Sequence, residues 1–168
     1  MATSDFAPKT GELSAPDSKN RFIAAFVEAA CTAVSEAASV EVVCQGIQEA
    51  PAASCPGNIV VAVDLHLPTE AGFELVFPGA TAEGVALRML SGATRTIDDD
   101  LISDCTAEVA NVIAGQATAM LAGEGIRKAF SLPRILATTS LDSGAGQGAV
   151  ILAFSTELGV FRLHLSGL

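Results

Sequence analysis

Three polar residues share one face of a predicted helix and have side chains that could do chemistry together. They are Asp104, Glu108 and Asn111, within the stretch DCTAEVANVIAGQ. At 100° per residue they fall within about 80° of one another, together with Gly115 and Thr118. A carboxylate can pair with a cation and an amide can orient a water, so a catalytic face is one interpretation. An ordinary solvated helix face is the other.

The helix that carries this face is predicted from Asp99 to Ala122. Asp98 is a suitable N-cap, and the acidic run 98–100 favours helix initiation more than it favours a magnesium site. Gly115 is a poor helix former, so its presence indicates that another element or a partner approaches closely. Small side chains form a separate seam that should pack on a helix of the same chain or of a second copy: Ala107, Ala110, Ala114 and Ala117.

The chain organisation predicts an α+β fold with two units of the same element order. Residues 1–19 are expected to be a mobile tail and residues 20–168 a single domain, with Asn20 as the N-cap of its first helix. The expected order is helix 20–39, strands 40–48, 58–67 and 73–79, short helix 80–92, helix 99–122, and strands 130–140, 149–157 and 159–167. Turns are expected at 70–72 and 142–148, and a C-cap at Gly92. An internally duplicated helix–strand–strand–strand unit therefore predicts long helices packed on one face of a largely antiparallel sheet.

Charge and composition narrow the range of partners. The 168 residues include 9 basic and 19 acidic side chains, giving a net charge of −10, which argues against nucleic acid and anionic membrane. No secretory signal or bilayer-length apolar run is present, so a cytoplasmic protein that docks on another protein is expected. The four cysteines are expected to be free thiols, with a Cys44–Cys55 disulfide as the alternative.

Much familiar enzyme chemistry is missing from the sequence. It has no Tyr, no Trp, no GxSxG and no phosphate-binding P-loop. His66 and His164 stand alone in predicted strands, where packing or surface exposure is the usual role. Because no nucleophile, metal set or cofactor cradle is visible, any catalysis needs a reactive group supplied by something else.

The spacing Asp104-x-x-x-Glu108-x-x-Asn111, followed by VIAGQATAML, resembles the signature helix of the CheC/CheX family of chemotaxis phosphatases. The preceding stretch FELVFPGATAEGVALRMLSG resembles that family's strand and short helix. The similarity covers roughly residues 57–166, with Pro133 one place earlier than the family's proline. Because only one Glu/Asn pair is present, the chain is most similar to single-site CheX-like members, for which a homodimer is expected.

The resemblance implies a phosphatase of the aspartyl phosphate on a CheY-like response-regulator receiver domain. Asn111 would align the attacking water and Glu108 would pair with the receiver's lysine, while Asp104, Gly115 and Pro133 would contact the partner. No cofactor or metal of its own is implied, since the magnesium belongs to the receiver. The alternatives are a non-catalytic adaptor of the same fold and, more remotely, a metal-dependent hydrolase using the carboxylates at 98–100.

Overall fold

The computed structural model describes residues 15–48, 57–66, 70–91, 93, 96–122, 130–137 and 149–168. Within these ranges, nine elements follow one another: α1 (Ala15–Ala38), β1 (Val43–Gln48), β2 (Ile59–His66), β3 (Glu70–Phe77), α2 (Gly79–Met89), α3 (Asp99–Ala122), β4 (Arg134–Leu136), β5 (Val150–Thr156) and β6 (Gly159–Ser166). The predicted α+β class and the repeated order of one long helix and three strands are confirmed.

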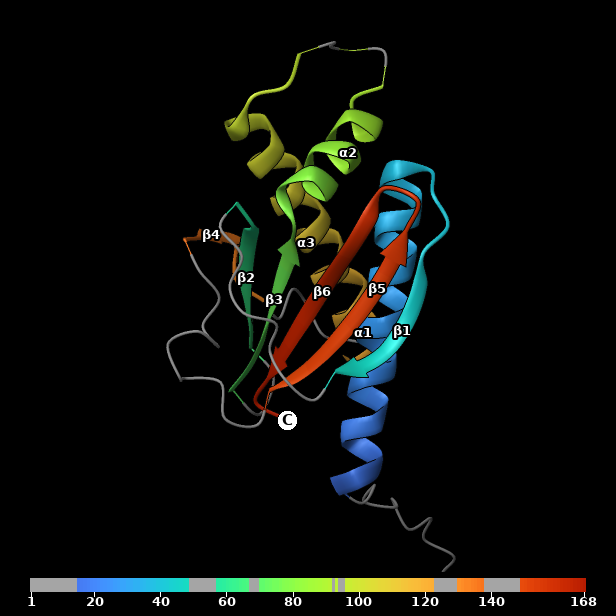
Figure 1. Ribbon diagram of the computed structural model, residues 1–168. Helices are drawn as coiled ribbons and strands as arrows, with labels where there is room; N and C mark the ends of the chain where they lie inside the picture. The colour runs from blue at the N-terminus through green and yellow to red at the C-terminus, as the bar shows by residue number, and fades with distance from the viewer. Residues whose placement is uncertain are drawn as a thin grey trace, which may run out of the picture.

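The six strands of the described ranges form one antiparallel sheet in the order β1-β5-β6-β3-β2-β4. The helices α1 and α3 pack against each other on one face of this sheet, and α2 lies across one end, as Figure 1 shows. Strands β1 and β4 are the two edges. Of these two edge strands, β4 contacts α3, the helix that carries the candidate residues.

Alternating side chains of the central strands build the core beneath the helices. Phe73, Leu75 and Phe77 of β3 all point to this side and are buried. Aromatic rings connect the sheet to the helix layer: the ring centroid of Phe26 on α1 lies 5.2 Å from that of Phe73 on β3. On β6, Phe161 stacks on Phe154 at 4.7 Å. The rigid layer under α3 is thus a dry apolar core.

The helix α3 has the predicted bounds, and its start has a clear cause. Oδ1 of Asp98 accepts a hydrogen bond from the backbone N–H of Leu101 at 2.9 Å, which confirms Asp98 as the N-cap. The alanine seam is covered within the chain, since Ala110, Ala114 and Ala117 are fully buried. A second copy is therefore not needed to cover these three side chains.

Several predicted boundaries were wrong. The first helix begins at Ala15, so Asn20 lies inside it and is not the N-cap; a proline at position 16 fits the first turn, where its missing N–H costs nothing. Residues 70–72 belong to β3 and not to a turn, and α2 ends at Met89 with Leu90 as its C-cap. Residues 1–14, Gly92 and the predicted turn at 142–148 lie outside the described residues.

The predicted hairpin at Leu158–Gly159 is confirmed, since Thr156 pairs with Gly159 across a two-residue turn. Gly159 has φ +132°, a backbone conformation that other residues adopt only with strain. A Cβ at this position would also collide with Thr81 of α2.

Gly159→Ala is therefore expected to lower the free energy of unfolding by about 1–3 kcal/mol in urea titrations. Gly84→Ala is a matched control, because its Cβ would lie 3.5 Å from Leu158, an ordinary contact, and Ala favours a helix. Equal stability of wild type and Gly159→Ala would contradict the expectation that a side chain at position 159 is strained.

Candidate functional site

The outer face of α3 presents the three residues singled out by the sequence. Asp104 and Glu108 are exposed and Asn111 is half-buried, one turn after Glu108. The prediction that Thr118 completes this exposed stripe was wrong. Thr118 is buried, and its hydroxyl donates to the carbonyl oxygen of Ala114 at 2.6 Å. The polar face therefore ends at Gly115.

A segment from the second half of the chain borders this face. The ring of Phe130 lies at Gly115, where its Cζ is 4.0 Å from the position that a Cβ would take. Five residues later, Ile135 of β4 lines the same pocket as Ser103 of α3. Residues 130–135 therefore pass along the flank of α3 from Gly115 toward Ser103, and half-buried Pro133 lies within this segment.

The approach at Gly115 is an ordinary van der Waals contact, so an alanine fits there. Gly115→Ala is expected to raise the free energy of unfolding by up to about 1 kcal/mol, because alanine is the better helix former. Ala119→Gly, at an exposed position of α3, is the reverse control and should cost a similar amount. Denaturant titrations compare the two, and destabilisation by Gly115→Ala would reveal a contact tighter than 4.0 Å.

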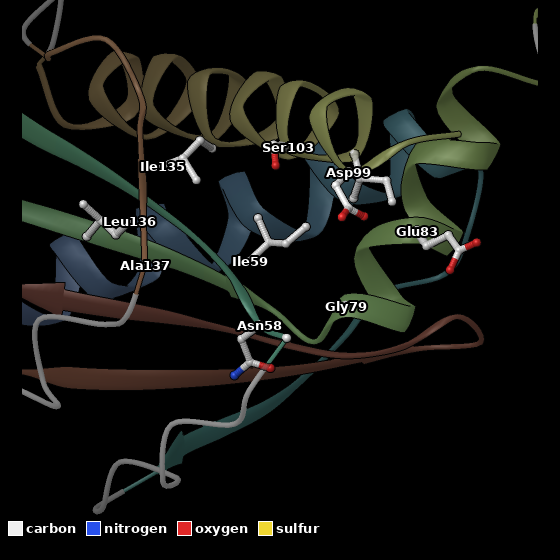
Figure 2. Close-up of a pocket in the computed structure, with 11 residues that line it drawn as sticks. Asn58, Ile59, Gly79, Glu83, Asp99, Ser103, Ile135, Leu136 and Ala137 are labelled. Atoms are coloured by element: carbon white, nitrogen blue, oxygen red, sulfur yellow. The ribbon is translucent and has the colours of Figure 1, made fainter. Parts of the chain in front are cut away.

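A pocket of about 460 Å³ opens near the N-terminal end of α3. It lies between α3, β4 and the starts of β2 and α2, and Figure 2 shows the Asp99 carboxylate and the Ser103 hydroxyl pointing from α3 into this space. Asp104, Glu108 and Asn111 are not among its lining residues. The candidate residues therefore lie outside this pocket, with Asp104 and Glu108 exposed on the helix surface.

The described residues form no cluster of metal ligands near this face. Among the residues that the structure describes, no group of three His, Cys, Asp or Glu side chains could hold a metal ion. Cys31, Cys44 and Cys105 are free thiols, and Cys55 lies outside the described residues. Burial and then the neighbouring Asp104 carboxylate raise the pKa of the Cys105 thiol, which disfavours the thiolate that a nucleophile needs.

One buried polar pair, on neighbouring strands of the sheet, was not predicted from the sequence. Glu74 of β3 and His164 of β6 are directly opposite in register, and Oε2 of Glu74 lies 3.6 Å from Nδ1 of His164. Both side chains are buried on the sheet face opposite the core helices, since their neighbours Phe73 and Leu75 point to the helices. The pair is cross-strand and 90 positions apart in the chain, so spacing alone gave no signal of it.

Two exposed apolar side chains on the segment beside α3 were not predicted from the sequence either. Leu132 is 83% exposed and Ile135 is 50% exposed, both on the segment that borders α3. Their position on either side of Pro133, next to an expected partner-binding residue, was the only available signal.

The fold and the face together define a class of protein: an α+β domain with a long helix packed over an antiparallel sheet, which presents an exposed carboxylate and a half-buried amide. Residues 59–154, more than half of the chain, match the family model described as "Chemotaxis phosphatase CheX". The chain therefore belongs to the CheX family of chemotaxis phosphatases.

Solved structures have the same fold at low sequence identity. The chain is similar to the chemotaxis protein CheX from Desulfovibrio desulfuricans, with a TM-score of 0.69, 19% identity, and 86% of this chain and 97% of that chain covered. It is similar to CheX from Vibrio vulnificus, with a TM-score of 0.68, 17% identity, and 86% and 97% coverage. It also resembles a chain of the CheX–CheY–BeF3–Mg2+ complex from Borrelia burgdorferi, with a TM-score of 0.63, 22% identity, and 86% and 96% coverage. No curated protein matches the sequence. None of the helices in the described ranges is long and apolar enough to cross a membrane.

Proposed function

We propose that this protein hydrolyses the aspartyl phosphate of a CheY-like receiver domain, with Asn111 and Glu108 of α3 as the groups that enter the partner's active site. The observation that carries the proposal is the position of this Glu/Asn pair on the outer face of α3 in a chain of the CheX family, with Glu108 exposed and Asn111 half-buried one turn later. The same face lies outside the nearby pocket, which favours a protein substrate over a small molecule.

In the proposed mechanism, Glu108 pairs with the receiver's active-site lysine and so orients the two proteins. The amide of Asn111 then hydrogen-bonds a water and holds it in line with the acyl phosphate. The water oxygen forms a bond to phosphorus, the bond between phosphorus and the aspartyl oxygen breaks, and inorganic phosphate and a free carboxylate result. A neutral amide suits this position because it adds no charge beside the phosphoryl dianion.

The rigid support of α3 favours such a positioning role. Its inner face carries fully buried Val109, Ala110 and Ile113, so the turn that presents Glu108 and Asn111 is fixed by the core. Holding a water in the right geometry is most of what phosphoryl transfer requires from a protein, and the reactive phosphoryl group and its Mg2+ belong to the receiver. Asp104, one turn before Glu108, extends the acidic docking face.

A solved relative lends support to the choice of partner. The Borrelia burgdorferi structure is described as a complex of CheX with CheY, BeF3 and Mg2+, and this chain covers 96% of the matched chain at 22% identity. We extend that partner class to this protein as a proposal. The homodimer expected from the resemblance stays a prediction, which light scattering on the purified protein would test.

The test is multiple-turnover dephosphorylation of a CheY-type receiver from the same organism. The receiver is phosphorylated with a small phosphodonor, the donor is removed, and catalytic amounts of the protein are added. The expected result is release of many phosphates per molecule of protein. If the receiver binds but loses its phosphate only at its intrinsic rate, the protein is a non-catalytic adaptor and not a phosphatase.

A further inference from the structure

The segment that borders α3 contains a β-bulge. Phe130 pairs with Leu65 of β2, whereas Arg134 pairs with Ala62. The three residues 131–133 therefore stand opposite only two residues of β2, so one extra residue is accommodated there. Pro133 has no N–H to donate to β2, which explains why regular pairing stops at this point.

Asp64 of β2 holds the bulge in place from three atoms. Its backbone N–H donates to the Ser131 hydroxyl oxygen at 3.0 Å, and its carbonyl oxygen accepts from the Ser131 N–H at 2.8 Å. Its carboxylate pairs with the Arg134 guanidinium at 3.0 Å. Ser131 and Arg134 are thus both bound to Asp64, which fixes the chain on either side of Leu132 and Pro133.

The side chain presented by the bulge is Leu132, which is 83% exposed, more than any other large hydrophobic residue in the described ranges. A single exposed leucine is ordinary on a protein surface. Here, however, the leucine lies within a bulge, and half-exposed Ile135 follows three residues later on the same segment. Bulges of this kind frequently re-aim side chains beside functional sites.

The segment that carries Leu132 borders α3, the helix that carries the proposed catalytic face. Phe130, two residues earlier, reaches α3 at Gly115, one helical turn after Asn111. Ile135, three residues later, shares the pocket with Ser103, two turns before Asn111, and Figure 2 shows it beside α3. Two extended residues span about 7 Å and one helical turn about 5 Å, so Leu132 passes close to the level of Asn111.

The charges around Leu132 indicate the chemistry of its partner. The neighbouring face of α3 carries exposed carboxylates at Asp100, Asp104 and Glu108, and the nearby Arg134 is already paired with Asp64. An apolar patch bordered by carboxylates fits a protein surface that combines apolar side chains with a lysine. That is the surface required of the receiver in the proposed function, and the acidic border disfavours a second copy of this equally acidic chain.

We propose that Leu132, held outward by the bulge at residues 131–133, is the apolar anchor through which the receiver domain docks beside Asn111. This inference rests on the proposed function and adds a binding residue outside the family's Glu/Asn motif. Leu132 sets affinity for the receiver and takes no part in orienting the water.

The test is the dissociation constant for a CheY-type receiver of the same organism in its beryllofluoride-activated, magnesium-bound form. Leu132→Asp is expected to weaken binding by roughly tenfold or more, the effect of losing a well-buried interface anchor. Ile47→Asp is the matched control, because Ile47 is 60% exposed on β1, the opposite edge of the sheet, and its variant should bind as wild type does. Leu132→Met should keep most of the affinity. Thermal unfolding of each variant checks the fold.

The outcomes separate this inference from the proposed function. Wild-type affinity for Leu132→Asp, with phosphatase activity intact, would overturn the anchor and leave the phosphatase standing. Equal weakening by Leu132→Asp and Ile47→Asp would also overturn it, as would conversion of a dimer to a monomer by Leu132→Asp with receiver affinity unchanged. A wild-type protein that binds no receiver would overturn both. A Leu132→Asp variant that binds weakly but reaches the wild-type rate at saturation would support the anchor.

Discussion

Asn111→Ala is expected to slow receiver dephosphorylation by roughly 100-fold or more, because a water that is no longer held in line loses the advantage of positioning. The affinity for the receiver should change only a few-fold, since Asn111 is half-buried and uncharged, whereas Glu108 and Asp104 supply the exposed charge. The measurement is the maximal rate at saturating receiver, with the dissociation constant determined in parallel.

A second substitution at the same position sharpens this prediction. Asn111→Asp keeps the shape and replaces the amide by a carboxylate, which places negative charge beside the phosphoryl group. Its rate should fall by at least as much as that of Asn111→Ala. A variant Asn111→Asp with the wild-type rate would contradict the role of the amide.

Glu108→Lys is expected to raise the dissociation constant for the receiver by roughly 100-fold, because it replaces an attraction to the partner's lysine by a repulsion. Glu108→Ala should have a smaller effect, since it removes the attraction only. Both effects should shrink as salt is added, because the face is open to solvent. Titrations at low and high ionic strength provide the measurement.

The control for net charge is Glu28→Lys. Glu28 is an exposed glutamate on α1, where Cys31 stands in place of the asparagine. Glu28→Lys changes the net charge by the same amount as Glu108→Lys, but outside the proposed docking face. The affinity for the receiver should therefore stay close to that of the wild type. Equal weakening by Glu28→Lys and Glu108→Lys would mean that the overall charge of the protein governs binding and that Glu108 has no special role.

Much of the fold could be predicted because local signals and tertiary structure agree. Asp98 caps α3 as its side chain predicts, and the alternating strands β5 and β6 meet at the predicted turn. The candidate face could be placed for the same reason. On a helix with one buried side, the angular positions of Asp104, Glu108 and Asn111 leave them only the outward direction.

Features that depend on contacts between distant segments could not be predicted. The bulge at 131–133 arises from pairing with Asp64, nearly 70 residues earlier, and this pairing leaves Leu132 exposed where a regular strand would have been expected. Thr118 lies at an angle that suits the outer face, yet it is buried and satisfies its hydroxyl within α3. Composition was misleading at the N-terminus, where Pro16 was expected in a tail but lies in the first turn of α1.

The decisive measurement is the decay of a phosphorylated CheY-type receiver mixed with an equimolar amount of wild type or Asn111→Ala, with complex formation followed in the same samples. Positioning of water by Asn111 predicts that both proteins bind and that only the wild type accelerates the decay. Equal acceleration by both would contradict Asn111 as the catalytic residue, and binding without acceleration by either would contradict the phosphatase itself.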